Sequence, residues 1–408
     1  MTEPSEPRPR RIAHLTSVHP PFDTRIFVRE CGSALAAGYE VTLVAAHDRS
    51  ECRDGIDIRA VPRASSRLRR MLRTTWQVFR EARRAKADLY QFHDPELIPV
   101  GLMLKLLGHR VVADIHEDLP KQVLSKPWIP RPLRRAASLA VRVVESTGAW
   151  AFDGVVAAEP DIADRFPPKK TVLVQNFPIA DELAPPGASG SASLSARPAN
   201  VLYVGSLSRL RGMCELVRAI ESLPKSLDAR LLLAGKFESI ELERELSRMP
   251  GWRRVDAQGH CSRDRVRELM GVSRIGIVTL LPCPKYVAAY PTKLFEYMSG
   301  GLPVIASDFP LWRRIVESAG CGLLVDPERP EAIAEAIHWL LEHPAEADAM
   351  GRRGRQAVLD RYDWANEAEK LLAFYDRLLG ACDAHCDFDA AEAALVPSPP
   401  ARRGRGPG

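Results

Sequence analysis

The residues best suited to chemistry lie in "YPTKLFEYMSGGLPVIASD", residues 290–308. Lys293 and Glu296 are three positions apart, so a helix that begins after Pro291 carries both side chains on one face. The start of such a helix offers unpaired backbone N–H groups to an anion, and a glutamate one turn later accepts two hydrogen bonds from a ribose diol. The pattern predicts a nucleotide-binding helix. The alternative is a surface helix with a solvated Lys–Glu pair.

Histidine and acidic side chains follow two predicted strands in the N-terminal half. His93 and Asp94 follow the strand in "ADLYQFHDPELIPV", and His116 follows the strand in "VVADIHEDLPKQV". A single strand-end histidine is more often structural than catalytic. Two that converge on one cleft favour a functional site.

The elements that position these residues are short apolar strands that alternate with helical patterns. At 408 residues the chain is long enough for two domains. The strands are continuously apolar, as in parallel sheets covered by helices on both faces. Ligands bind such sheets at the carboxyl ends of the strands. The strands expected in the first half are 11–18, 41–46, 56–61, 88–93, 110–116, 154–158 and 171–175, and a second α/β series begins at residue 200.

The composition is that of a globular protein, with 46% hydrophobic and 27% charged residues. No apolar run approaches the ~20 residues that cross a bilayer, and no signal segment is visible near Met1. We therefore expect a cytoplasmic protein. The eight cysteines are mostly scattered, which predicts reduced thiols. The segment "CDAHC", residues 382–386, lacks a full ligand set, so no zinc site is expected there.

The stretch "KLFEYMSGGLPVIASD" resembles the nucleotide-sugar motif of family 4 glycosyltransferases, retaining enzymes of the GT-B fold. The resemblance extends over most of residues 11–375. It implies that Glu296 binds the donor ribose and that backbone groups of Thr292 and Lys293 contact the diphosphate. Ala288 stands where the family usually has another acidic residue, which contacts the donor sugar.

A second family landmark is "YVGSLSRLRG", residues 203–212. The family commonly has two cations here that hold the donor diphosphate, and such cations stabilise the charge that grows on the leaving group. Ser206, after Gly205, replaces the first cation, whereas Arg211 occupies the position of the second. Arg209 is expected to supply the missing charge. The alternative is that both arginines lie on a solvated turn.

The resemblance also assigns roles in the N-terminal half. His116 matches a histidine close to the donor sugar, and His93 and Asp94 are assigned to the acceptor side. In the loop "SVHPPFDTRIFVREC", residues 17–31, Asp23 is expected to cap the next helix. Asp23 and Arg25 are then part of the acceptor-side wall; the alternative is a cap and a surface salt bridge.

The implied architecture is α/β: GT-B, with two Rossmann-like doubly wound parallel-sheet domains that face a central cleft. We expect an acceptor-side domain (11–180), a linker (181–200), a donor-binding domain (201–362) and a C-terminal helix (363–380) that packs back on the first domain. Residues 1–10 and 384–408 are expected to be disordered.

The implied reaction is sugar transfer from a nucleotide sugar to a glycan, lipid-linked or small-molecule acceptor, in cell-envelope polysaccharide biosynthesis. The diphosphate itself takes the acceptor proton, and no metal or other cofactor is expected. Because Ala288 and Ser206 depart from the family pattern, two alternatives stay open. One is a non-catalytic nucleotide-sugar-binding partner of another glycosyltransferase; the other is a nucleotide-sugar epimerase of the same architecture.

Two basic segments, 63–86 and 126–144, bear on the acceptor. In the first, "RASSRLRRMLRTTWQVFREARRAK", apolar residues recur at helical spacing beside many arginines. Such helices suit the surface of an anionic membrane, at the inner face, where a lipid-linked acceptor is found. The alternative is that the apolar stripe packs on the sheet and the arginines are solvated. Nucleic-acid binding is not expected, because the net charge is only +5 and no recognition module is present.

Overall fold

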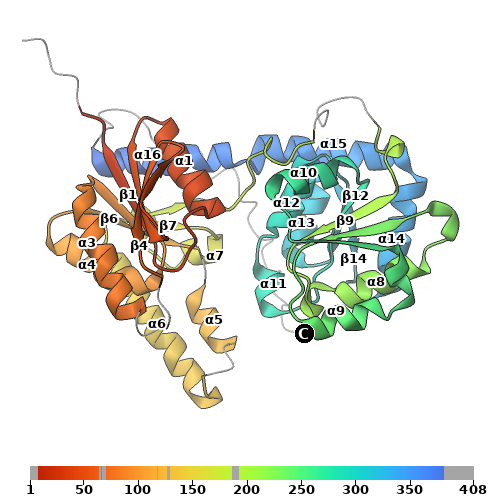
Figure 1. Cartoon of the computed structure of the whole chain (residues 1–408), viewed down its shortest axis with the longest axis horizontal. Helices are drawn as coiled ribbons and strands as arrows, with labels where there is room; N and C mark the ends of the chain where they lie inside the picture. Colours follow the sequence, from red (N-terminus) through yellow and green to blue (C-terminus); the bar gives the residue numbers. More distant parts are fainter. Residues whose placement is uncertain are drawn as a thin grey trace, which may run out of the picture.

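The computed structural model describes residues 8–63, 66, 70–116, 118–125, 129–185 and 193–380. Two α/β domains lie side by side (Figure 1). Most of the predicted N-terminal tail, all of the predicted C-terminal tail, the "CDAHC" segment and residues 186–192 of the predicted linker lie outside the described residues.

The N-terminal domain is built on an eight-stranded sheet in the order β3-β4-β2-β1-β5-β6-β7-β8. Its pairs are parallel except β3–β4, which is antiparallel. All seven predicted strands are confirmed, and β3 is additional. The strands are β1 (Arg11–Leu15), β2 (Glu40–Ala46), β3 (Glu51–Arg53), β4 (Ile56–Val61), β5 (Leu89–Phe92), β6 (Arg110–Ile115), β7 (Gly154–Ala157) and β8 (Thr171–Leu173).

The C-terminal domain has a six-stranded parallel sheet in the order β11-β10-β9-β12-β13-β14. In each sheet the chain winds one way and then the other, from β1 and from β9, so the loops after these strands lie at a switch point where ligands bind. The strands are β9 (Asn200–Val204), β10 (Arg230–Ala234), β11 (Val255–Gly259), β12 (Ile275–Val278), β13 (Val304–Ser307) and β14 (Gly322–Val325).

Helices cover both faces of each sheet. In the N-terminal domain they are α1 (Gly32–Ala36), α3 (Thr75–Ala85), α4 (Ile98–Leu106), α5 (Leu119–Ser125), α6 (Arg131–Ala151) and α7 (Pro160–Ala163), with a wide π-type turn, η1 (Thr24–Cys31), after β1. The C-terminal domain has α8 (Met213–Ser222), α9 (Ile240–Ser247), α10 (Arg263–Gly271), α11 (Pro284–Ala288), α12 (Thr292–Ser299), α13 (Pro310–Ala319), α14 (Pro330–Glu342) and α15 (Pro344–Arg361). Within the described part of the chain, each helix is too short or too polar to span a bilayer.

The last helix, α16 (Trp364–Leu379), runs from the C-terminal domain across to the N-terminal one (Figure 1). Its Phe374 and Tyr375 are buried in the same apolar core as β1 and β2. A Cβ atom on Gly154 would lie 2.3 Å from the Phe374 ring, so this contact requires glycine in β7. Tyr375 also donates a 2.6 Å hydrogen bond to Gln91 of β5. The C-terminal helix therefore completes the core of the first domain.

Candidate active site between the two domains

A cavity of about 300 Å³ lies between the domains at the carboxyl ends of their strands. It brings several predicted site residues together: Asp23, Arg25 and His116 from the N-terminal domain, and Thr292, Lys293 and Glu296 from the C-terminal one. It is also lined by residues that the sequence did not single out, namely His19, Arg29 and Arg263.

Glu296 is the best-defined polar group of this cavity. Helix α12 begins after Pro291, as predicted, and buries Glu296 to 5% exposure. Lys293 Nζ donates to one carboxylate oxygen at 2.7 Å, and Arg263 Nη1 donates to the other at 2.9 Å. Burial alone would raise the pKa of Glu296, but these two cations hold it below its usual value. Glu296 is thus a buried, charged acceptor rather than part of a solvated pair.

Arg263, at the start of α10, ties this carboxylate to the chain that joins the domains. Its guanidinium donates to both carboxylate oxygens of Glu182 at 2.7 and 2.6 Å. Arg29 approaches from the N-terminal domain and is buried, and its Nε has no hydrogen-bond partner. Burial lowers the pKa of Arg29 to about 10. Only the fold reveals this cluster, because its members come from four separate segments.

Asp23 caps the turn η1, as predicted. Its carboxylate accepts hydrogen bonds from the backbone N–H groups of Arg25, at 2.8 Å, and Ile26, at 3.0 Å. Burial would raise the pKa of Asp23, but His19 and these two N–H groups hold it at about 2. The backbone N–H of Val28 reaches back five residues to the carbonyl of Asp23, at 3.3 Å. Such π-type turns are frequent at functional sites.

Arg25 is buried rather than exposed, so the alternative of a surface salt bridge is wrong. Its Nη2 donates to Asp114 Oδ1 at 2.8 Å and its Nε to Oδ2 at 3.1 Å. Its Nη1 donates to the side-chain oxygen of Asn176 at 2.9 Å, and Glu30 lies 2.9 Å from Nε. Burial would raise the pKa of Asp114, but Arg25 and the imidazole groups of His116 and His93 hold it well below its usual range. Asp114 was missed, although an acid within the apolar run "RVVADI" was a signal for it.

His93 is buried behind this pair. Its Nδ1 lies 2.7 Å from Asp114 Oδ2, and its Nε2 shares a 3.0 Å hydrogen bond with His14. Burial lowers the pKa of both histidines. Two groups of side chains have atoms that could bind a metal ion within 4.8 Å of one another. One is His93, Asp114 and His116, and the other is His14, Glu30 and His93. The Arg25 guanidinium already neutralises the Asp114 carboxylate, which disfavours a second cation there.

His116 directly follows β6 and lines both of two neighbouring cavities. Its Nε2 lies 3.2 Å from His19 Nε2, and its Nδ1 lies 3.5 Å from Asp114. His19 Nδ1 lies 3.7 Å from Asp23. The nearby Asp23 carboxylate is the largest effect that raises the pKa of His19. Both histidines also line a larger cavity, of about 420 Å³, within the N-terminal domain.

Asp94 lies at the same edge of the sheet, in the wall of the larger cavity. It is buried, and its Oδ2 accepts hydrogen bonds from the Thr16 hydroxyl at 2.8 Å and from the Ser17 and Val18 backbone N–H groups at 2.5 and 3.1 Å. Asp94 therefore fixes the loop that carries His19.

The predicted diphosphate loop follows β9 and lies outside the lining of either cavity. Gly205 adopts φ +148°, where other residues are strained. The Arg211 guanidinium lies 5.8 Å from the centre of the Tyr286 ring and close to Tyr203. Arg209 is exposed and pairs with Glu245. The predicted leaving-group roles of both arginines remain predictions.

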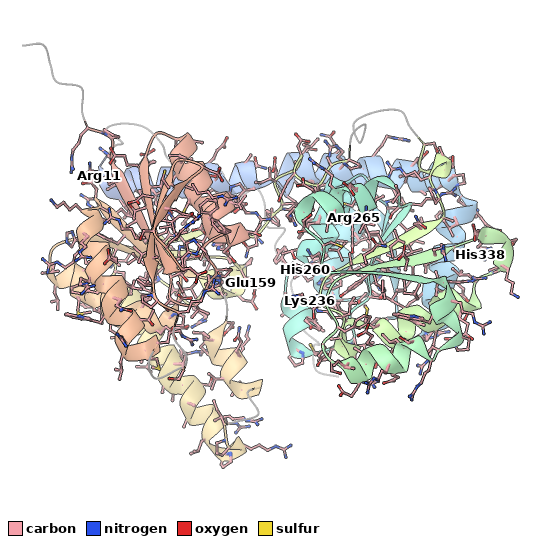
Figure 2. All side chains as sticks on the ribbon, in the orientation of Figure 1. Arg11, Glu159, Lys236, His260, Arg265 and His338 are labelled. Atoms are coloured by element: carbon pink, nitrogen blue, oxygen red, sulfur yellow. The ribbon has the colours of Figure 1, made fainter. Side chains whose placement is uncertain are left out.

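Lys236 is a cation beside Ser206 that the sequence did not single out. Its carbonyl accepts a 2.9 Å hydrogen bond from the backbone N–H of Leu207, the residue after Ser206. Figure 2 shows Lys236 and His260 on the side of the C-terminal domain that faces Glu159 of the N-terminal domain.

Comparisons with known proteins agree with this geometry. Residues 25–176 match the Glycosyl transferase 4-like domain, and residues 191–357 match Glycosyl transferases group 1. A GDP-mannose:cellobiosyl-diphosphopolyprenol alpha-mannosyltransferase from Xanthomonas campestris is 25% identical over 60% of this chain and 64% of its own length. The phosphatidyl-myo-inositol mannosyltransferase of Mycobacterium tuberculosis is 23% identical over 72% of this chain and 75% of its own. The chain thus spans less than two thirds of the length of the Xanthomonas campestris mannosyltransferase.

Among solved structures, sucrose-phosphate synthase from Thermosynechococcus elongatus is similar over 91% of this chain and all of its own, with a TM-score of 0.70 and 21% identity. This likeness confirms the GT-B fold. The two relatives named above are mannosyltransferases. They therefore do not favour the alternatives of a non-catalytic binding partner or an epimerase. The chain belongs to the glycosyltransferases that combine a 4-like N-terminal domain with a group 1 C-terminal domain.

Proposed function

We propose that the chain is a retaining glycosyltransferase that moves a sugar from a nucleotide-sugar donor to a lipid-linked or other glycan acceptor. The observation that carries this proposal is the position of Glu296. It is a buried carboxylate one turn into α12, in a cavity whose opposite wall contains His116 of the other domain.

The donor nucleotide is assigned to the C-terminal side of the cavity. Glu296 accepts hydrogen bonds from the ribose diol with the oxygen lone pairs that Lys293 and Arg263 leave free. The backbone N–H groups of Thr292 and Lys293 lie at the N-terminus of α12 and are free to bind a diphosphate oxygen. Gly205 and Ser206, in the loop after β9, are assigned to the diphosphate by the family resemblance.

The chemical step breaks the bond between the anomeric carbon and the diphosphate and forms a bond to the acceptor oxygen on the same face. The departing diphosphate oxygen takes the acceptor proton. Arg211 stabilises the charge that grows on the diphosphate, with Arg209 as a second candidate, and His116 positions the donor sugar. In this scheme protein cations do the work that a metal does in other transferases, so no metal is required.

The acceptor is assigned to the N-terminal domain, beside Asp23, Arg25, His93 and Asp94. Two relatives support a lipid-linked acceptor by name, since one is a cellobiosyl-diphosphopolyprenol mannosyltransferase and the other a phosphatidyl-myo-inositol mannosyltransferase. We place the enzyme at the inner face of the membrane.

Contact with an anionic membrane is proposed through the two basic segments, 63–86 and 126–144. The predicted apolar stripe of α3 is divided: Phe79 is buried, whereas Trp76 is 57% exposed beside exposed arginines. On α6, apolar side chains such as Leu139 and Val143 are exposed, and the exposed charges of this helix are arginines. Apolar and cationic groups on one face favour an anionic bilayer.

The test is to incubate the protein with a panel of nucleotide sugars and lipid-linked acceptors and to follow nucleotide release. The anomeric configuration of the product is then read by NMR. Release with a retained configuration supports the proposal, whereas an inverted product or tight binding without turnover on any acceptor contradicts it.

A further inference from the structure

The larger cavity, of about 420 Å³, lies within the N-terminal domain and is separate from the donor side of the cleft. It is enclosed by the ends of β5 and β6 and by helices α4, α5 and α6. Its volume is within the range of pockets that hold small molecules. Most of its wall is apolar, with Phe92, Ile98, Ala113, Leu119, Ala149 and Phe152 among the lining residues.

The carboxylates in the wall are already paired within the protein. Glu96 accepts from Arg70 at 2.6 Å and from the Ser17 hydroxyl at 2.7 Å. Glu145 is buried and pairs with Arg165, and Asp94 and Asp114 have the partners described above. A site built for a glycan presents free polar groups to many hydroxyls, because an unpaired hydroxyl in a dry pocket costs free energy. The polar side chains of this wall are mostly paired with one another, and the area that the wall exposes to the cavity is mainly apolar.

The polar end of the cavity is the pair His19 and His116. Both side chains line the larger cavity and the cleft. A ligand in the larger cavity therefore presents one end to the histidines and to the donor sugar, while the rest of it lies against apolar side chains.

Helix α6 connects this cavity to the molecular surface. Glu145 and Ala149 face the cavity, while Val143, Val144 and Trp150, at the same level of the helix, are exposed. Figure 1 shows α5 and α6 as a pair of helices that projects from the N-terminal domain. Exposed apolar side chains of α6 therefore lie on the same helix that forms part of the cavity wall.

We infer that the larger cavity binds an uncharged, apolar part of the acceptor that lies next to its reacting hydroxyl. This inference rests on the proposed function and narrows its acceptor class. An acceptor that places only sugar residues in the cavity is thereby excluded.

The experiment compares octyl β-D-glucopyranoside, below its critical micelle concentration, with methyl β-D-glucopyranoside, by calorimetric titration of the full chain. Leu119→Trp on α5 fills the cavity from its half-buried wall position. The matched control is Leu124→Trp on the same helix, which is exposed and lies outside the cavity lining. We expect the wild type to bind the octyl glycoside at least ~10-fold more tightly than the methyl glycoside, a difference of ~1.4 kcal/mol.

Leu119→Trp is expected to lose this preference, and Leu124→Trp to keep it. A second variant, Gln122→Leu, makes the wall more apolar and is expected to strengthen octyl binding. Equal binding of the two glycosides, binding of neither, or an unchanged preference in Leu119→Trp overturns the inference. Nucleotide-sugar binding is measured in the same proteins. Its absence refutes the proposed function, whereas nucleotide binding without octyl preference refutes only the acceptor class.

Discussion

Arg25 holds Asp114 by two hydrogen bonds, from Nη2 at 2.8 Å and from Nε at 3.1 Å, with both side chains buried. The pair joins the turn after β1 to the end of β6, the two elements that carry His19 and His116.

Asp114→Asn is therefore expected to destabilise the chain strongly. It removes one of the two buried carboxylates that pair with Arg25, while Glu30 remains, and breaking a buried pair typically costs ~3–5 kcal/mol. The free energy of unfolding in urea at neutral pH measures it. The control is Glu268→Gln, which breaks an exposed pair with Arg265 and is expected to change stability by under ~1 kcal/mol. Equal effects of the two substitutions would refute a structural role for the Arg25–Asp114 pair.

Asp23→Ala is expected to lower stability by ~1 kcal/mol because it removes the cap of η1. The pKa of Asp23 is lowered from 3.8 to about 2 in the folded protein. Its contribution is therefore fully present above pH 3.8 and is lost as the pH falls through about 2. The stability gap between wild type and Asp23→Ala should close over this range. Nucleotide-sugar affinity should stay unchanged at neutral pH, and a loss of donor binding in a folded variant contradicts an acceptor-side position.

His19 is expected to stabilise the folded chain at low pH, whereas Asp23 does so at higher pH. The pKa of His19 is raised from 6.5, chiefly by the nearby Asp23 carboxylate, and the charges of Asp94 and Asp114 act in the same direction. The contribution is complete below pH 6.5 and is lost as the pH rises through the folded pKa. The stability gap between wild type and His19→Gln should narrow as the pH rises above 6.5 through the folded pKa. In the Asp23→Ala background most of the gap should vanish; a gap that widens with pH is the opposite of this expectation.

Arg211 and Arg209 are expected to differ in catalysis. Arg211 is half-buried against two tyrosines, whereas Arg209 is exposed and paired with Glu245. Loss of a preorganised cation on the leaving group costs ~100–1000-fold in kcat. Arg211→Ala should show such a loss, and Arg209→Ala should change kcat only a few-fold. Steady-state kinetics with the preferred donor tests the order of the two effects, and a larger loss in Arg209→Ala would reverse the assignment.

Local patterns predicted much of the fold and part of the site. The strands were found because most of them lie in short, mainly apolar runs, and α12 because Pro291, Lys293 and Glu296 have helical spacing with two glycines after them. The cap at Asp23 is likewise a local interaction, between a side chain and backbone N–H groups within three residues.

Contacts between distant segments were not predictable in this way. Arg263 reaches Glu182 and Glu296, which are 81 and 33 residues away, and His19 meets His116 across 97 residues. The sequence signal for Arg263 is only a charged residue at a helix start. The burial of Arg25 was missed for the same reason, since its partner lies 89 residues away.

The central claim is that Glu296 binds the ribose of a nucleotide sugar in the cleft. The most direct test is calorimetric titration of wild type and Glu296→Ala with a panel that includes GDP-mannose and UDP-glucose. We predict that wild type binds at least one donor and that Glu296→Ala, which stays folded with a lowered melting temperature because Lys293 and Arg263 lose a buried partner, binds it at least ~10-fold more weakly. Wild-type protein that binds no nucleotide sugar, or a folded Glu296→Ala variant with unchanged affinity, would contradict the account.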